Sequence, residues 1–258
     1  MGHERLGALP RTRRWQTIVD GIAASQEGGT QAVGDLAERT LENVEDRFLR
    51  IHKDSGVQAA FAYLISLATA SLPPSGGLAS PDTRIECDLS PARIAKNLCD
   101  WVRKHGSSPE YAEIACRAGA DTIAQWTRKQ SEQGRLFDDR SDAAQIWGKS
   151  SDGASFCQIA RTFFARFTER YLRYFLERHA SSQLSSVSAR ERFNEHLHEH
   201  VDEVSHHAFE IAEITQSFAA GWFNKHAVQA RPSDREIEGF LAVAFGKLRE
   251  ELKRETDR

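Results

Sequence analysis

Histidine and acidic side chains are concentrated in one short stretch of the sequence. Five of the ten histidines lie between positions 196 and 207, interleaved with Glu and Asp residues. On a helix, four side chains would follow one flank of the apolar stripe at i, i+4, i+7 and i+11, namely His196, His200, Glu203 and His207. Imidazole and carboxylate groups one helical turn apart can reach a common ion, so this set is a candidate metal site.

A structural role competes with the metal site for these side chains. The helical wheel directs His206 opposite Leu197, toward solvent, and places His198 on the other flank. A di-metal bundle also needs a second helix with inward carboxylates at matching spacing, and none stands out in the sequence. The H-E-x-x-H and deaminase signatures are absent as well. We therefore favour a structural or surface role with no bound cofactor, and keep a metal-dependent hydrolase as an alternative.

Arg173 and His179 indicate a second chemistry. All-helical ribonucleases of the HEPN class carry an arginine and a histidine separated by four to six residues, in which the arginine binds phosphate and the histidine acts as acid or base. The chain contains four such pairs, about as many as its composition gives by chance. Arg173 and His179 are the best placed, near the end of a predicted core helix, although Tyr174 stands where the motif commonly has a polar residue. A HEPN-like ribonuclease is therefore an alternative function.

Arginines alternate with aromatic residues between positions 161 and 178. Basic groups interleaved with aromatic rings can bind phosphates and stack on bases. The aromatics, however, share one broad face as core residues do, and Arg170 lies near the centre of that face, where an isolated charge would be costly. We expect Arg170 to pair with a carboxylate from another helix, with a nucleic-acid or phosphate contact as the alternative.

Three arginines stand at the start of the first predicted helix. Arg11, Arg13 and Arg14 precede or open this helix, where the helix dipole disfavours cations. Their placement favours contact with an acidic partner, including the phosphates of a nucleic acid, over a contribution to helix stability. A solvated helix end is the competing interpretation.

The elements that must position these side chains are helices. Apolar residues recur at spacings of three and four through nearly the whole chain, and no stretch alternates with the period of a strand. One helix is expected around Trp15 to Ile22, a second from near Thr30, and a central buried helix over the apolar run 57–72. The sequence therefore predicts an all-α multi-helix bundle of about eight helices.

The longest predicted helix covers residues 189–228 and carries the histidines. It contains no proline, and its apolar residues follow a nearly heptad spacing. A continuous helix of this length would extend ~55–60 Å, so it would brace both halves of the molecule or pair with another chain. After it, Ser233 and Glu236 form a capping-box pattern that opens a terminal helix.

Two stretches interrupt the helical pattern. Residues 73–88 are rich in proline and glycine, and residues 131–153 are polar and contain several glycines. We therefore expect an N-terminal helical lobe over residues 1–130, a polar loop over 131–153 and a C-terminal lobe with the long helix over 154–258. One continuous domain is the alternative.

Composition limits the classes of protein that fit. The chain has 258 residues, is 40% hydrophobic and carries a formal charge of −3, which argues against a general polyanion binder and against a disordered chain. No apolar run is long enough to span a membrane, and no signal peptide is apparent, so we expect a cytoplasmic protein. The four cysteines form no C-x-x-C pair and are interpreted as core residues.

These observations favour a non-enzymatic helical interaction or scaffold subunit of a cytosolic assembly. It would act through self-association or by docking a partner protein, using the histidine-bearing helix and the terminal helix. The alternatives are the HEPN-like ribonuclease or metal-dependent hydrolase, and a nucleic-acid-binding accessory protein.

Overall fold

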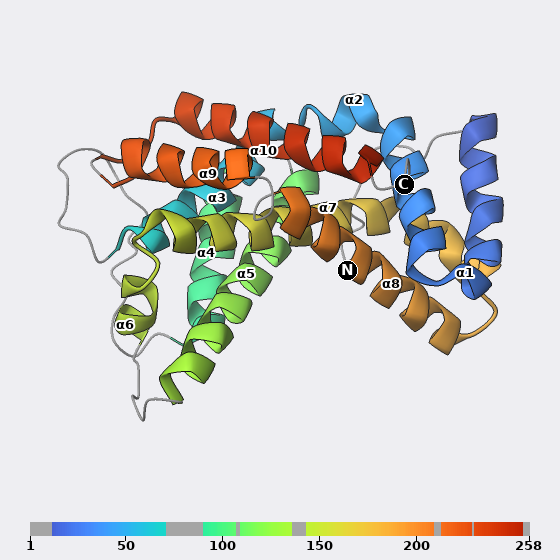
Figure 1. Ribbon diagram of the computed structural model, residues 1–258, viewed down its shortest axis with the longest axis horizontal. Helices are drawn as coiled ribbons and strands as arrows, with labels where there is room; N and C mark the ends of the chain where they lie inside the picture. The colour runs from blue at the N-terminus through green and yellow to red at the C-terminus, as the bar shows by residue number, and fades with distance from the viewer. Residues whose placement is uncertain are drawn as a thin grey trace.

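The computed structural model describes residues 12–70, 90–106, 109–135, 143–208, 213–228 and 230–254, and every regular element in these ranges is a helix. The predicted all-α class is therefore confirmed (Figure 1). No described helix is long and apolar enough to cross a membrane. The elements in chain order are α1 (Arg13–Asn43), α2 (Glu45–Phe48), the 3-10 helix η1 (Ile51–Lys53), α3 (Ser55–Ala68), α4 (Pro91–His105), α5 (Pro109–Arg135), α6 (Ala143–Gly148), α7 (Gly153–Gln183), α8 (Val187–His206), α9 (Glu213–His226) and α10 (Asp234–Arg254).

Two helices replace the single long helix predicted over 189–228. α8 ends at His206, α9 begins at Glu213, and residues 209–212 lie outside the described part of the chain. α8 packs against α1 and α7, and α9 also packs against α7. α8 and α9 run in different directions (Figure 1). A straight helix of this length would project beyond the core, whereas the different directions of α8 and α9 let both helices lie against α7. The described ranges thus hold ten α-helices rather than about eight.

α1 is a helical hairpin rather than one straight helix. Gly29 adopts a φ of 61°, outside the helical region, in a conformation that L side chains disfavour. The two halves fold back on each other: a Cβ atom on Gly21 would lie 2.8 Å from Leu36 Cδ2, and Thr12 Oγ1 lies 3.3 Å from Asn43 Oδ1. The two helices predicted on either side of Thr30 are therefore confirmed.

α7 lies at the centre of the bundle and packs against α1, α3, α5, α8 and α9. Most of its aromatic side chains are buried and join rings from α3 and α10; the ring centroid of Phe164 lies 5.0 Å from that of Phe245 on α10 and 5.4 Å from that of Phe61 on α3. α3 is buried along almost its whole length, as its apolar run predicts. The buried residues form one hydrophobic cluster that includes Trp15 near one end of the chain and Leu252 near the other.

The predicted polar loop over 131–153 is partly helical. α5 continues to Arg135 and α6 occupies Ala143–Gly148, while residues 136–142 lie outside the described ranges. α6 packs against α3 and α5, and Trp147 is almost fully buried. This apolar anchor explains why a segment of polar composition contains a helix. The other predicted loop, 73–88, lies outside the part of the chain that the structure describes.

The capping box at the start of α10 is confirmed. Ser233 N and Ser233 Oγ each lie 2.7 Å from Glu236 Oε2, and Glu236 N lies 3.4 Å from Ser233 Oγ. His226 Nδ1, on α9, lies 2.7 Å from the other carboxylate oxygen, Oε1. The hydrogen bonds from the Ser233 side chain and backbone, followed by the contact with His226, lower the pKa of Glu236 to about 2.

The close approach of α3 to α5 makes Gly56 sensitive to substitution. A Cβ atom at this position would lie 2.9 Å from Ala112 Cβ and 3.0 Å from Ala112 Cα. Relieving this overlap would require the backbone of α5 to move, which is energetically costly. We predict that Gly56→Ala lowers the free energy of unfolding by about 1–3 kcal/mol, as overpacking does. Urea denaturation followed by circular dichroism measures this change in the free energy of unfolding. Gly221→Ala is the matched control, because its Cβ meets nothing within 4 Å; equal effects of the two substitutions would contradict this packing.

The lowered pKa of Glu236 predicts how the cap responds to acid. Since the folded-state value lies below the ordinary 4.5, the stabilisation is present above about 4.5 and is lost as the pH falls toward about 2. Carboxyl-carbon NMR titration should give a midpoint near 2 for Glu236, and Ser233→Ala should move it upward. A midpoint of about 4.5 in the unsubstituted protein would show that the cap does not form in solution.

Candidate functional site

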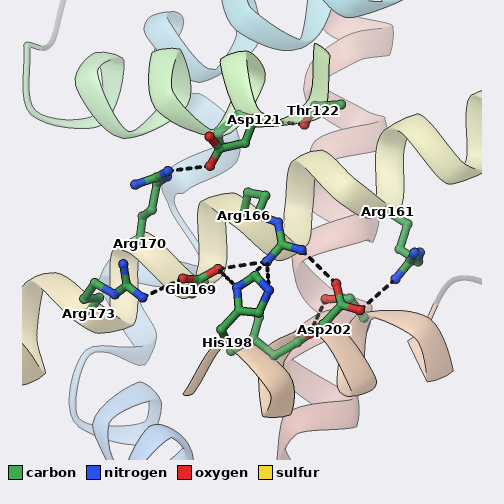
Figure 2. A network of polar contacts seen from close by, with 12 residues as sticks. Asp121, Thr122, Arg161, Arg166, Glu169, Arg170, Arg173, His198 and Asp202 are labelled. Atoms are coloured by element: carbon green, nitrogen blue, oxygen red, sulfur yellow. Dashed lines mark hydrogen bonds and ion pairs between the residues drawn. The ribbon is translucent and has the colours of Figure 1, made fainter. Parts of the chain in front are cut away.

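A network of charged side chains joins α7 to α8 (Figure 2). Arg166, Glu169 and Arg173 follow one another at i, i+3 and i+7 on α7, and therefore lie along one face of that helix. His198 and Asp202, at i and i+4, present a matching row on α8. The sequence thus places two polar rows beside the apolar stripes, and helix packing brings the rows together.

Glu169 is the centre of this network. Its side chain is only 7% exposed, and that of Arg166 only 10%. Arg166 Nη1 donates to Glu169 Oε2 at 3.0 Å, and Arg173 Nη2 pairs with Oε1 at 2.9 Å. Both oxygens of the buried carboxylate therefore face a guanidinium, which offsets the cost of removing these charges from water.

His198 connects the carboxylate to α8. Its Nδ1 lies 2.8 Å from Glu169 Oε2, and Arg166 Nη1 lies against the ring, 2.6 Å from Nδ1 and 3.0 Å from Nε2. A guanidinium can only donate and a carboxylate can only accept, whereas an imidazole ring can do both, so His198 can bridge Arg166 and Glu169.

The remaining members of the network balance its charge. Asp202 accepts from Arg166 Nη2 at 3.2 Å and pairs with Arg161 Nη1 at 3.5 Å, while Arg173 Nε lies 3.4 Å from Glu177 Oε1. Burial raises the pKa of Glu177 above its ordinary value, and Arg173 opposes that rise. The formal charges of the three arginines and three carboxylates of the network balance, so these six side chains offer no net attraction for an anion.

Arg170 has the type of partner that its sequence position predicts. Its Nη2 pairs with Asp121 Oδ2 on α5 (Figure 2), which confirms the expected carboxylate from another helix. The side chain of Arg170 is 26% exposed, so a phosphate approaching it would compete with Asp121. The sequence indicated the need for an acid here, but not which acid would supply it.

Arg173 and His179 have separate partners. Arg173 is held by Glu169 and Glu177 on its own helix, whereas His179 Nε2 accepts from Trp15 Nε1 on α1 at 3.3 Å. Six residues along a helix correspond to about 600°, which leaves the two side chains about 120° apart around α7. The two side chains therefore face different neighbours in the fold.

The four histidine and glutamate side chains of the candidate metal site are also dispersed. His200 is buried against α1, where a Cβ on Gly34 would lie 2.7 Å from its Cε1. His196 borders a small hollow together with Ser25, Glu203 is exposed and His207 is half-buried. Within the described ranges, no group of three or more His, Cys, Asp or Glu side chains could hold a metal ion.

The arginines at the start of α1 are only partly described. Arg13 and Arg14 are exposed, and Arg11 lies outside the described ranges. The helix begins with Thr12, whose Oγ1 accepts from Trp15 N at 3.1 Å. The hydroxyl cap and the buried Trp15 fix this end of the helix, while the two arginines extend into solvent and remain available to an acidic partner.

Comparison with protein-family models, with curated proteins and with solved structures finds no match. The function of the chain is therefore inferred from its own residues. Sequence reasoning did not single out Glu169 and did not pair it with His198, because the two are 29 positions apart on different helices and only packing pairs them. The one sequence signal of Glu169 is the charged row that interrupts the otherwise aromatic helix α7.

Glu169 should be the most sensitive carboxylate of this network. We predict that Glu169→Gln lowers the free energy of unfolding by about 3 kcal/mol or more, because Arg166 stays buried beside a neutral amide. Glu177→Gln, which removes an outer partner of Arg173, should cost less than about 1 kcal/mol. Urea denaturation of both variants measures the difference. Similar losses for the two would show that Glu169 is not the centre of the network.

Proposed function

We propose that this protein is a non-enzymatic helical interaction subunit that self-associates through the outward face of its terminal helix, α10. The observation that carries the proposal is a band of small and apolar residues on that face, between side chains of opposite charge. The paired state of the polar network supports the non-enzymatic part, because Arg173 and His179 are each engaged by other side chains of the fold.

The outward face of α10 consists of Gly239, Val243 and Gly246. A Cβ atom on either glycine would meet nothing within 4 Å, and Val243 is 40% exposed. Val187 and Val243 are the only large hydrophobic side chains with this degree of exposure within the described ranges. The opposite face of the helix is buried through residues such as Phe240 and Leu248. A shallow, flat strip therefore runs along the outer side of α10.

Glycine is a costly choice at these two positions. In the interior of an exposed helix, glycine is about 1 kcal/mol less favourable than alanine. No neighbour within the described ranges lies close enough to exclude a Cβ atom at either position. Small residues do allow the backbone of another helix to approach closely, which increases the packed area along the strip. Close approach of a second helix thus accounts for both glycines.

Charge favours a second copy of the chain as the occupant. Arg235 lies exposed at one end of the strip and Glu250 at the other, at nearly equal distances from its centre between Ala242 and Val243. In an antiparallel pair related by a twofold axis, Arg235 approaches Glu250 of the second copy, and the same contact recurs on the other side. Glu250 also pairs with Lys247 at 3.0 Å, but this pair is exposed and contributes little.

A charge-swap experiment tests the proposal. Arg235→Glu and Glu250→Arg should each weaken self-association about tenfold, because each converts two attractive contacts into two repulsive ones. The double variant carrying both substitutions should restore it, because the opposite charges face each other again. Sedimentation equilibrium over a range of protein concentrations gives the dissociation constants.

A variant that fills the strip provides a second test of self-association through α10. Gly239→Gln should abolish self-association by filling the strip, while a normal circular dichroism spectrum shows that the fold is kept. The proposal would be overturned if the chain stayed monomeric at every concentration, or if the unsubstituted chain and all three charge variants dimerised equally.

A further inference from the structure

Two cysteines meet at the packed interface between α4 and α5, which lie side by side (Figure 1). The thiol of Cys116 lies against Cys99, with Cys116 Sγ 3.8 Å from the carbonyl oxygen of Cys99. The helices are in close contact here, since a Cβ on Gly119 would lie 2.7 Å from Leu98 Cδ1. The two thiols are therefore neighbours held on rigid elements.

The surroundings give the two thiols different properties. Cys99 is half-buried, whereas Cys116 is only 2% exposed. The hydrogen bond from Cys116 lowers the pKa of Cys99, with a further contribution from Arg103, against the opposing effects of burial, Glu113 and Asp100. The same hydrogen bond, together with burial, raises the pKa of Cys116. Cys99 is thus the more accessible thiol and the one that loses its proton more readily, while Cys116 is buried and holds its proton more tightly.

We propose that Cys99 and Cys116 form a peroxide-reactive dithiol site that closes to a disulfide between α4 and α5. This site is separate from the α10 face and does not depend on the proposed self-association. Cys116 and Cys157 are buried in the core and Cys99 packs against it, as interpreted from the sequence, and the proposal adds a chemical role for two of them. Their 17-residue separation concealed the contact, because only helix packing creates it.

The chemistry balances with a hydroperoxide as the oxidant. The Cys99 thiolate attacks one peroxide oxygen, so that an S–O bond forms, the O–O bond breaks and hydroxide (or an alkoxide) leaves. The sulfur of Cys116 then attacks the Cys99 sulfenic acid; an S–S bond forms and the S–O bond breaks. The Cys116 proton goes with the departing hydroxide as water. Two electrons pass from the two thiols to the peroxide, and an external thiol reverses the reaction.

The test uses the full chain, reduced and then freed of reductant. Treatment with hydrogen peroxide, followed by iodoacetamide and intact mass spectrometry, should show a product in which the polypeptide has lost about 2 Da before alkylation. Only two of its four cysteines should be alkylated. Peptide mapping should place the disulfide between Cys99 and Cys116, and reduction with dithiothreitol should restore four alkylated thiols.

Variants identify the role of each sulfur. In Cys116→Ser, Cys99 should stop at the sulfenic acid, which dimedone traps, and no disulfide should form. Cys157→Ser is the matched control, since Cys157 is buried on α7 and the disulfide should form as before. The proposal is overturned if peroxide leaves Cys99 and Cys116 fully alkylatable, or if Cys99 is instead linked to Cys87 or to a second chain.

Discussion

The burial of α7 on most of its sides is the constraint on which the rest of the structure depends. A helix packed against α1, α3, α5, α8 and α9 must fill its surroundings with aromatic side chains, and it does. The same helix carries arginines that cannot reach water freely, so they need carboxylates nearby. Glu169 meets this need for Arg166 and Arg173, and it fixes the position of α8 through His198.

This constraint also explains what the sequence could predict. Local signals sufficed for the helices, for the break near Gly29 and for the cap at Ser233, because hydrogen bonds and apolar spacing within a few residues determine them. The sequence also indicated that Arg170 needs an acid. It could not identify Asp121, which lies 49 positions away, because such a pairing depends on how helices dock. The different directions of α8 and α9 were missed because heptad spacing is the same in one helix or two.

The residues selected for their chemistry are distributed by packing rather than gathered. The histidines of α8 face different neighbours: His200 packs near Gly34, whereas His198 faces Glu169 on α7. Features that remain available to other molecules lie elsewhere, on the outer strip of α10 and at the thiols between α4 and α5. Neither stood out as a motif, because the strip consists of small residues and the thiols come from separate helices.

Native-state hydrogen exchange tests the central role of α7 most directly. If the fold depends on this helix, its backbone amides between Phe163 and Phe175 should exchange most slowly in the whole chain, at a rate set by global unfolding. Amides of the outer helix α4 should exchange sooner, through local opening. If the amides of α7 exchanged as fast as those of α4, α7 would not be the element on which the others depend.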